Sequence, residues 1–447
     1  MKTFLCTALL GALLTVSGAA APAPTNEPDV IAFINVTVIP MDRERVLEKH
    51  TVVVQGERIV AVGPADEVDV PEGALTIDGT GKYLLPGLAE MHGHVPPPNA
   101  PPAYTDAVLF LYAANGITTV RGMLGADNQL ELREKANKGE IISPTLYLAG
   151  PSFNGNAINS PEEAVAKVRQ QKAEGWNLLK IHPGLTVEEY DAMARTAHEE
   201  GIRFGGHVPA DVGLMHAIEM GQETFDHLDG YVEYLMQINE AAIDEEALDE
   251  LVRRTKEAGA WVVPTMALWE ALYGTIDIED LRAYDELKYM PRNQVQGWFS
   301  NYEQRLSSPQ FDRAEALRII QARMQVLQAL HEGGAGILMG TDAPQLFSVP
   351  GFSLHRELER MEAAGMPPYA IIESGTRNVG VYFANEDDFG TVATGQRADL
   401  VLVNANPLDN IRHLQQRSGV MVRGRWLSEK AIQDRLTEIE VSYRDGS

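Results

Sequence analysis

The chain has 447 residues, of which 45% are hydrophobic, so it can form one large core with a smaller domain and is not a disordered chain. Its 63 acidic residues outnumber 37 Lys and Arg residues, which gives a formal net charge of -26. Such a surface repels phosphate backbones and anionic membranes, so the charge argues against nucleic acid as a partner.

The first 20 residues have the layout of a secretory signal peptide. Lys2 precedes an apolar stretch at 4–16, and small residues follow at 17–21. The stretch is too short to span a membrane permanently. We therefore expect cleavage after Ala20, a tether at 21–28, and a periplasmic or secreted protein without stable membrane insertion. The other interpretation is a buried N-terminal helix. Cys6 is the single cysteine and lies within this segment, so the mature chain would have no disulfide and no Cys-bound metal.

Short β-type runs lie near both ends of the remaining chain. They cover 31–39, 51–63, 75–84, 389–402 and 419–426, and a charged helix is predicted at 429–443. We expect the parts 29–83 and 389–447 to form one small β-sandwich domain built from both chain ends.

The middle of the chain, 84–388, alternates apolar strands with amphipathic helices, which is typical of an α/β protein with parallel strands. We predict eight strands, at 84–91, 117–122, 145–149, 178–181, 203–206, 223–226, 261–265 and 336–340. Helices are expected at 161–174, 187–200 and 245–257, among others. The pattern predicts a (β/α)₈ TIM barrel. A long aromatic-rich helical insertion at 268–331 either covers the active face or only buries its own aromatic residues.

Two histidines, His92 and His94, end the first predicted barrel strand. Residues two apart on a strand point to the same side, so both imidazoles can share one metal ion. A chance pair of core histidines is the other interpretation.

Lys180 ends the fourth predicted strand inside an otherwise apolar run. An unpaired ammonium group there is costly, so something must compensate its charge. The two options are a salt bridge and carbamylation by CO₂, which converts the amine to a carboxylate that can bridge two cations.

Further polar residues follow the next strands: His207 and His227 end the fifth and sixth, and Asp342 ends the eighth. Each alone is a weak signal. Together they lie at the C-terminal ends of barrel strands, where the catalytic groups of this fold converge.

With these residues, the chain resembles the amidohydrolase superfamily, in its imidazolonepropionase-like and Xaa-Pro dipeptidase-like branch. The motifs that carry the resemblance are the Pro86-Gly87 run to His94, the Lys180 strand, His207, His227, Gly340-Thr341-Asp342, and the tail from Gly395 to Leu408. The resemblance implies that His92, His94 and Asp342 hold one metal, that His207 and His227 hold a second, and that carbamylated Lys180 bridges them.

The implied enzyme is a metal-dependent hydrolase that cleaves an amide or peptide bond of a dipeptide or N-acyl amino acid, with metal-activated hydroxide as nucleophile. The donors are nitrogen and oxygen without sulfur, which favours Zn²⁺ first and leaves Mn²⁺, Fe²⁺ or Co²⁺ open. Asp342 would accept the proton of the attacking water and pass it to the leaving amine. The alternatives are a mononuclear cyclic amidase or deaminase and, less favoured, a non-catalytic secreted binding protein.

The candidate substrate contacts are His182, two residues beyond Lys180, and Tyr231, four residues after His227. A surface or core role is the other interpretation of each. Many dipeptidase-like relatives carry a histidine in the loop after the third strand, whereas residues 150–157 of this chain contain none. This departure bears on the dipeptidase assignment and leaves the metal ligands untouched. The fold class also often associates into homo-oligomers.

Overall fold

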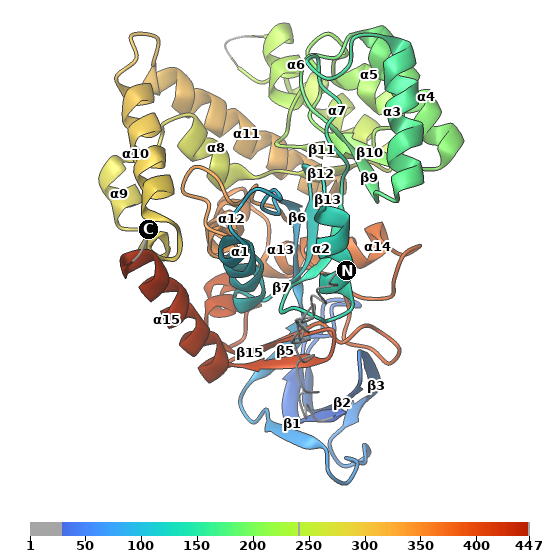
Figure 1. Ribbon diagram of the computed structural model, residues 1–447, viewed down its shortest axis with the longest axis vertical. Coiled ribbons are helices and arrows are strands. Elements are labelled where there is room, and N and C mark those ends of the chain that lie inside the picture. Colours follow the sequence, from blue (N-terminus) through green and yellow to red (C-terminus); the bar gives the residue numbers. More distant parts are fainter. Residues whose placement is uncertain (1–28, 240–241, 446–447) are drawn as a thin grey trace, which may run out of the picture.

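The computed structural model describes residues 29–239 and 242–445. The predicted signal peptide and most of the tether lie outside the described residues. Figure 1 shows a barrel-like body of strands and surrounding helices above a smaller β domain. None of the helices in the described part of the chain is both long and apolar enough to cross a membrane.

The smaller domain is one mixed sheet made from both ends of the described chain. Its strands run in the order β16-β15-β14-β5-β1-β2-β3, and β4 pairs with β1. They are β1 (Val30–Val38), β2 (Leu47–Gln55), β3 (Arg58–Pro64), β4 (Leu75–Asp78), β5 (Tyr83–Pro86), β14 (Leu400–Val403), β15 (Arg417–Val422) and β16 (Arg425–Ser428). The two chain ends meet where β5 pairs antiparallel with β14. The strands form one sheet, so the two-sheet sandwich that we predicted is not seen.

The body contains two parallel sheets, one of five strands in the order β13-β12-β11-β10-β9 and one of three, β6-β7-β8. Their strands are β6 (Leu88–Gly93), β7 (Ile117–Gly122), β8 (Thr145–Leu148), β9 (Leu178–Ile181), β10 (Arg203–Gly206), β11 (Thr224–Asp226), β12 (Trp261–Val263) and β13 (Gly336–Ile337). Backbone hydrogen bonds also link the edges of the two sheets, from Gly150 N to Leu178 O (3.0 Å) and from Met91 N to Met339 O (2.8 Å). Parallel strands are therefore present as expected.

The first predicted barrel strand, 84–91, is divided in two by the fold. Residues before Gly87 belong to β5 of the small sheet, and those after it form β6. A Cβ at Gly87 would lie 2.1 Å from the Thr118 hydroxyl oxygen, so only glycine allows the chain to pass there. The predicted strand 389–402 is likewise too long. Its first part turns at Gly390 and Gly395, both with positive φ.

Helices connect the parallel strands and cover them from outside. They are α1 (Pro102–Ala114), α2 (Gln129–Asn137), α3 (Pro161–Glu174), α4 (Val187–Glu200), α5 (Leu214–Glu219), α6 (Tyr231–Ile238), α7 (Glu245–Glu257), α12 (Phe352–Ala363), α13 (Pro368–Ser374) and α14 (Arg377–Tyr382). The short helix η2 (Ile411–Gln415) and the terminal helix α15 (Glu429–Asp445) complete the chain. Caps define several ends. For example, α4 begins at a capping box of Thr186 and Glu189 and ends at Gly201 with φ 61°.

The insertion forms α8 (Met266–Leu272), α9 (Ile278–Arg282), η1 (Asp285–Tyr289), α10 (Arg292–Leu306) and α11 (Arg313–Gly333). Its aromatic residues do more than pack on one another. Trp298, Phe299 and Tyr302 of α10 surround Phe347 with ring centroids 5.8, 4.9 and 5.8 Å away. Because Phe347 lies in the loop that follows Asp342, the insertion packs directly on a segment next to the predicted site.

Candidate metal centre

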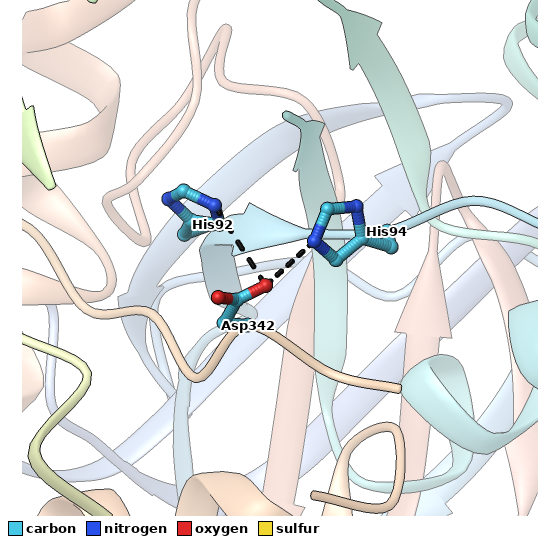
Figure 2. A group of neighbouring side chains, drawn as sticks. All are labelled: His92, His94 and Asp342. Atoms are coloured by element: carbon cyan, nitrogen blue, oxygen red, sulfur yellow. Dashed lines mark hydrogen bonds and ion pairs between the residues drawn. The ribbon is translucent and has the colours of Figure 1, made fainter. Parts of the chain in front are cut away.

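His92, His94 and Asp342 come together as the sequence predicts. One ligand atom from each lies within 4.8 Å of the others, and Figure 2 shows the three side chains turned toward one another. His94 Nε2 is 2.6 Å from Asp342 Oδ1, and His92 Nε2 is 3.7 Å from the same oxygen. These atoms form a compact nitrogen and oxygen donor set that a divalent cation can occupy.

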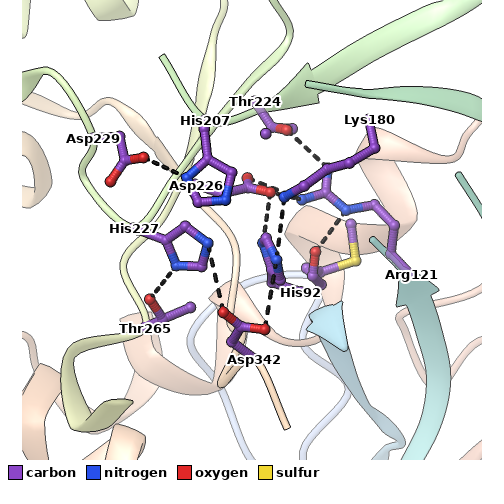
Figure 3. A network of polar contacts seen from close by, with 12 residues as sticks. His92, Arg121, Lys180, His207, Thr224, Asp226, His227, Asp229, Thr265 and Asp342 are labelled. Atoms are coloured by element: carbon purple, nitrogen blue, oxygen red, sulfur yellow. Dashed lines mark hydrogen bonds and ion pairs between the residues drawn. The ribbon is translucent and has the colours of Figure 1, made fainter. Parts of the chain in front are cut away.

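His207 and His227 lie beside this group (Figure 3). The imidazole of His227 has its centroid 4.3 Å from that of His92 and 4.7 Å from that of His207. His227 Nε2 is 3.6 Å from Asp342 Oδ2, so the Asp342 carboxylate lies between His94 and His227. The residues assigned to two different metal sites are therefore in one cluster.

The backbone leaves the strand conformation where two of these residues occur. His227 and Asp342 have φ values of 66° and 62°, a region that residues other than glycine rarely adopt. Both are held by backbone hydrogen bonds, His227 N to Val263 O and Asp342 N to His92 O, each 2.7 Å long. Residues with a strained backbone cluster at functional sites. The strain at these two residues therefore indicates a functional site at the C-terminal ends of the strands.

Lys180 is fully buried next to the cluster, with its Nζ 3.3 Å from His92 Nε2. Burial lowers its pKa to about 8, although the negative charges of Asp226 and Asp342 act in the opposite direction. Lys180 forms no ion pair among the described residues, so its charge is not compensated by a direct salt bridge. Of the two options in the sequence, the structure therefore gives no support to the salt bridge.

The imidazoles are oriented by groups that the sequence did not single out. His92 Nδ1 lies 2.7 Å from Asp226 Oδ2, and His207 Nδ1 lies 2.5 Å from Asp229 Oδ2. His227 Nδ1 is 2.7 Å from the Thr265 hydroxyl oxygen. In each case the pairing occupies Nδ1 and leaves Nε2 as the ring nitrogen on the other side, which is the arrangement of metal-binding histidines.

A buried arginine holds the carboxylate that orients His92. Arg121 of β7 is fully buried, and its Nη2 lies 3.1 and 3.2 Å from the two carboxylate oxygens of Asp226. Burial alone would raise the pKa of Asp226, but the positive charges of Arg121 and Lys180 lower it overall. A charged residue inside the apolar run 117–122 was the signal in the sequence that could have identified Arg121.

The electrostatics keep the histidines in their ligand form. Burial lowers the pKa of both His92 and His227 well below the ordinary value, and neighbouring positive groups add to this effect. Both are therefore neutral at pH 7. His227 Nε2 is buried and has no hydrogen-bond partner among the described residues. A metal ion would supply the missing partner, so the residues present fit such an ion.

The two predicted substrate contacts are placed differently. His182 stacks on His207 with ring centroids 4.9 Å apart, and burial lowers its pKa to about 3. Its Nδ1 has no hydrogen-bond partner among the described residues. Tyr231 instead begins α6, is fully buried, and its hydroxyl pairs with that of Thr255 at 2.8 Å. The expectation of a free loop tyrosine is therefore not met, because Tyr231 belongs to the core.

Comparisons with known proteins identify the family of the chain. The model of the amidohydrolase family matches residues 83–427. Adenine deaminase 3 of Rhizobium meliloti (strain 1021) is 20% identical, over 85% of this chain and 55% of its own length, so the chain spans about half of that relative. Ochratoxinase of Aspergillus niger is 22% identical, over 89% of this chain and 86% of its own length.

Among solved structures, a Xaa-Pro dipeptidase with bound methionine in the active site has a TM-score of 0.68 and 21% identity. The match covers 89% of this chain and 100% of that chain. Such a likeness supports the fold. The family match covers most of the chain and includes all six proposed metal ligands. The chain therefore belongs to the amidohydrolase family, enzymes that hydrolyse carbon–nitrogen bonds, as its motifs predict.

Proposed function

We propose that the protein is a binuclear metal hydrolase that cleaves the amide or peptide bond of a dipeptide or N-acyl amino acid. The observation that carries the proposal is the convergence of the His92, His94 and Asp342 ligand atoms within 4.8 Å. His207, His227 and Lys180 stand directly beside them. A set of imidazole and carboxylate donors of this kind suits Zn²⁺, and also Mn²⁺, Fe²⁺ or Co²⁺.

In this proposal His92, His94 and Asp342 hold one ion, and His207 and His227 hold the other. Lys180, as its carbamate, would supply a ligand to both ions. When bound, the ions lower the pKa of water and polarise the scissile carbonyl group. All remaining steps fall to side chains of this chain.

Asp342 is the proton carrier of the reaction. Its two oxygens face different histidines, Oδ1 toward His94 and Oδ2 toward His227. It accepts the proton of the attacking water and passes it to the leaving nitrogen. Asp226, Asp229 and Thr265 hold the imidazoles in the tautomer that leaves Nε2 free. His182, which stacks on His207 beside the centre, is the proposed substrate contact.

Carbamylation of Lys180 needs the uncharged amine. The uncharged amine nitrogen attacks CO₂ to form a new N–C bond and releases one proton, which turns the neutral amine into a carboxylate. Starting from the ammonium form, two protons leave in total. The pKa of about 8 leaves about a tenth of the Lys180 amines uncharged at pH 7. The missing ion pair and the bridging position both support this modification.

We also propose that the protein is exported to the periplasm or secreted, with cleavage after Ala20. The support is the sequence of the first 20 residues alone. N-terminal sequencing of protein recovered from outside the cytoplasm is the test, and an intact Met1 there would contradict it.

The activity is tested on a panel of dipeptides and N-acyl amino acids with protein reloaded with Zn²⁺ in bicarbonate buffer. We expect amide hydrolysis by the unaltered protein and loss of about 10³-fold or more in kcat for Asp342→Asn. Hydrolysis of cyclic amides alone, or release of ammonia from an aminopurine, would instead assign the cyclic amidase or deaminase alternative.

A further inference from the structure

Glu90 is a fully buried residue of β6 whose carboxyl group joins two chain segments of the metal centre. Its Oε1 accepts hydrogen bonds from the backbone N–H groups of His92 (3.0 Å) and Thr341 (2.7 Å). Its Oε2 lies 2.5 Å from the Thr341 hydroxyl oxygen. One side chain thus contacts both the segment that carries His92 and the residue that precedes Asp342.

These contacts lie at the junction between the two parallel sheets. Strand β13 ends at Ile337, and the backbone hydrogen bonds that continue toward β6 run from Met91 N to Met339 O and from Asp342 N to His92 O. Between them, the N–H groups of His92 and Thr341 face Glu90. Its carboxyl oxygen therefore supplies the acceptor that a neighbouring strand would otherwise provide.

The space around the group is closely filled. A Cβ at Gly340 would lie 2.9 Å from the His92 nitrogen and 3.1 Å from Glu90 Oε1. The Ser353 hydroxyl oxygen is 3.0 Å from that of Thr341, which extends the network to α12. The chain therefore has little freedom to shift at this junction unless the Glu90 contacts are lost.

Asp342 depends on this junction because it leaves the regular backbone directly after Thr341. Its φ of 62° requires that the residues on either side are firmly held.

We propose that Glu90 is a positioning residue that fixes the spacing between His92 and Asp342, and so the geometry of the first metal site. The inference rests on the proposed function, because it assigns Glu90 a role toward that same site. The feature that matters is the Oε1 acceptor. A glutamine keeps this acceptor and can donate from its amide to Thr341, whereas a methionine of similar length keeps neither.

The test compares Glu90→Gln with Glu90→Met in the full chain. Metal-free protein is titrated with Co²⁺ against a chelator, and the visible absorption of bound Co²⁺ reports the ligand geometry. We expect Glu90→Gln to bind within about 3-fold of the unaltered protein with the same spectrum. Glu90→Met is expected to bind about 10- to 100-fold more weakly with an altered spectrum, and to lose kcat with KM changed little.

Glu189 offers a matched control, because it is also a buried carboxylate that accepts a backbone N–H, but in the capping box of α4. Glu189→Met should lower the melting temperature without moving the Co²⁺ spectrum. Equal Co²⁺ affinity and equal spectra for the two Glu90 variants would overturn the inference. So would a Glu90→Met spectrum that changes no more than that of Glu189→Met.

If Glu90→Met does not fold, Glu90→Asp decides, because its shorter side chain cannot reach both N–H groups. An aspartate variant identical to the unaltered protein in affinity and spectrum would overturn the inference. Failure of the unaltered protein to bind Co²⁺ or to hydrolyse any amide would instead defeat the proposed function, so the two failures are distinguishable.

Discussion

Asp229 Oδ2 lies 2.5 Å from Nδ1 of His207, the same kind of contact that Asp226 makes with His92. The carboxylate holds the ring so that Nε2 points to the cluster. A carboxylate also pairs with an imidazole, through the other ring nitrogen, between α4 and α5, where Asp191 Oδ1 lies 2.6 Å from Nε2 of His216. The first pair serves the metal centre in our account, and the second does not.

Asp229→Asn should therefore weaken binding of the second divalent ion about 10- to 100-fold, because the amide no longer fixes the His207 tautomer. Competition of Zn²⁺ with a chelator measures the effect. Asp191→Asn is the matched control and should leave both ion affinities unchanged. Equal effects of the two substitutions would argue against a role of Asp229 at the centre.

Carbamylation predicts a pH dependence at Lys180. The amine has a pKa of about 8, so the uncharged fraction rises from about a tenth at pH 7 to about half at pH 8. Metal-free protein held at a constant concentration of dissolved ¹³CO₂ should show a carbamate carbon signal whose rate of appearance rises over this range. Lys180→Arg should give no such signal, and a signal that persists in that variant would assign the carbamate elsewhere.

Breaking the buried ion pair between Arg121 and Asp226 should lower the stability of the protein. Arg121→Met leaves the Asp226 carboxylate without its main positive partner, and we expect a loss of about 3–5 kcal/mol in the free energy of unfolding. Urea denaturation of metal-free protein measures this. The double variant Arg121→Met/Asp226→Leu should regain stability but still bind metal weakly, because His92 loses its orienting group. Full metal affinity in the double variant would contradict this account.

His355, which is not one of the proposed metal ligands, predicts how the stability of the protein changes in acid. Burial and the nearby charge of Arg417 lower the pKa of His355 well below 6.5, so the folded protein leaves it neutral where the unfolded chain protonates it. The unfolded state then binds more protons, and stability falls as the pH drops below 6.5, by at most about 1.4 kcal/mol per pH unit for this one group. His355→Gln should flatten the dependence of the free energy of unfolding on pH between 6.5 and 4.5. An unchanged slope would show that His355 is not part of this sensitivity.

A substitution at Tyr231 distinguishes a role in the core from a role in substrate binding. Tyr231→Phe removes the hydroxyl that pairs with Thr255, and we expect a loss of about 1 kcal/mol in stability with KM unchanged. A raised KM with unchanged stability would restore the substrate contact that the sequence suggested.

Much of the fold was predictable from local patterns. The strands 117–122, 178–181 and 203–206 and the helices 161–174, 187–200 and 245–257 agree with the structure to the residue. Apolar runs define the strands, and caps such as Ser160 and Gly175 define the helix ends. The shape of the small domain was not predictable, because the pairing of β5 with β14 joins residues more than 300 positions apart.

The same limit applies to the site. The residues His92, His94 and Asp342 were visible in the sequence because ligands concentrate at strand ends. The residues that orient the site were not visible, because they contact it from distant parts of the sequence. Thr265 pairs with His227, 38 positions away, and Glu90 pairs with Thr341, 251 positions away. Tyr231 was misplaced because spacing after His227 does not reveal that α6 begins there and turns the ring into the core.

The most direct test of the central claim is the number of divalent ions bound per chain after the metal-free protein is reloaded with Zn²⁺ in bicarbonate and dialysed. Our account predicts two ions per chain for the unaltered protein, and fewer for Lys180→Met. A single ion per chain that does not depend on Lys180 would contradict the binuclear centre and favour a mononuclear cyclic amidase or deaminase.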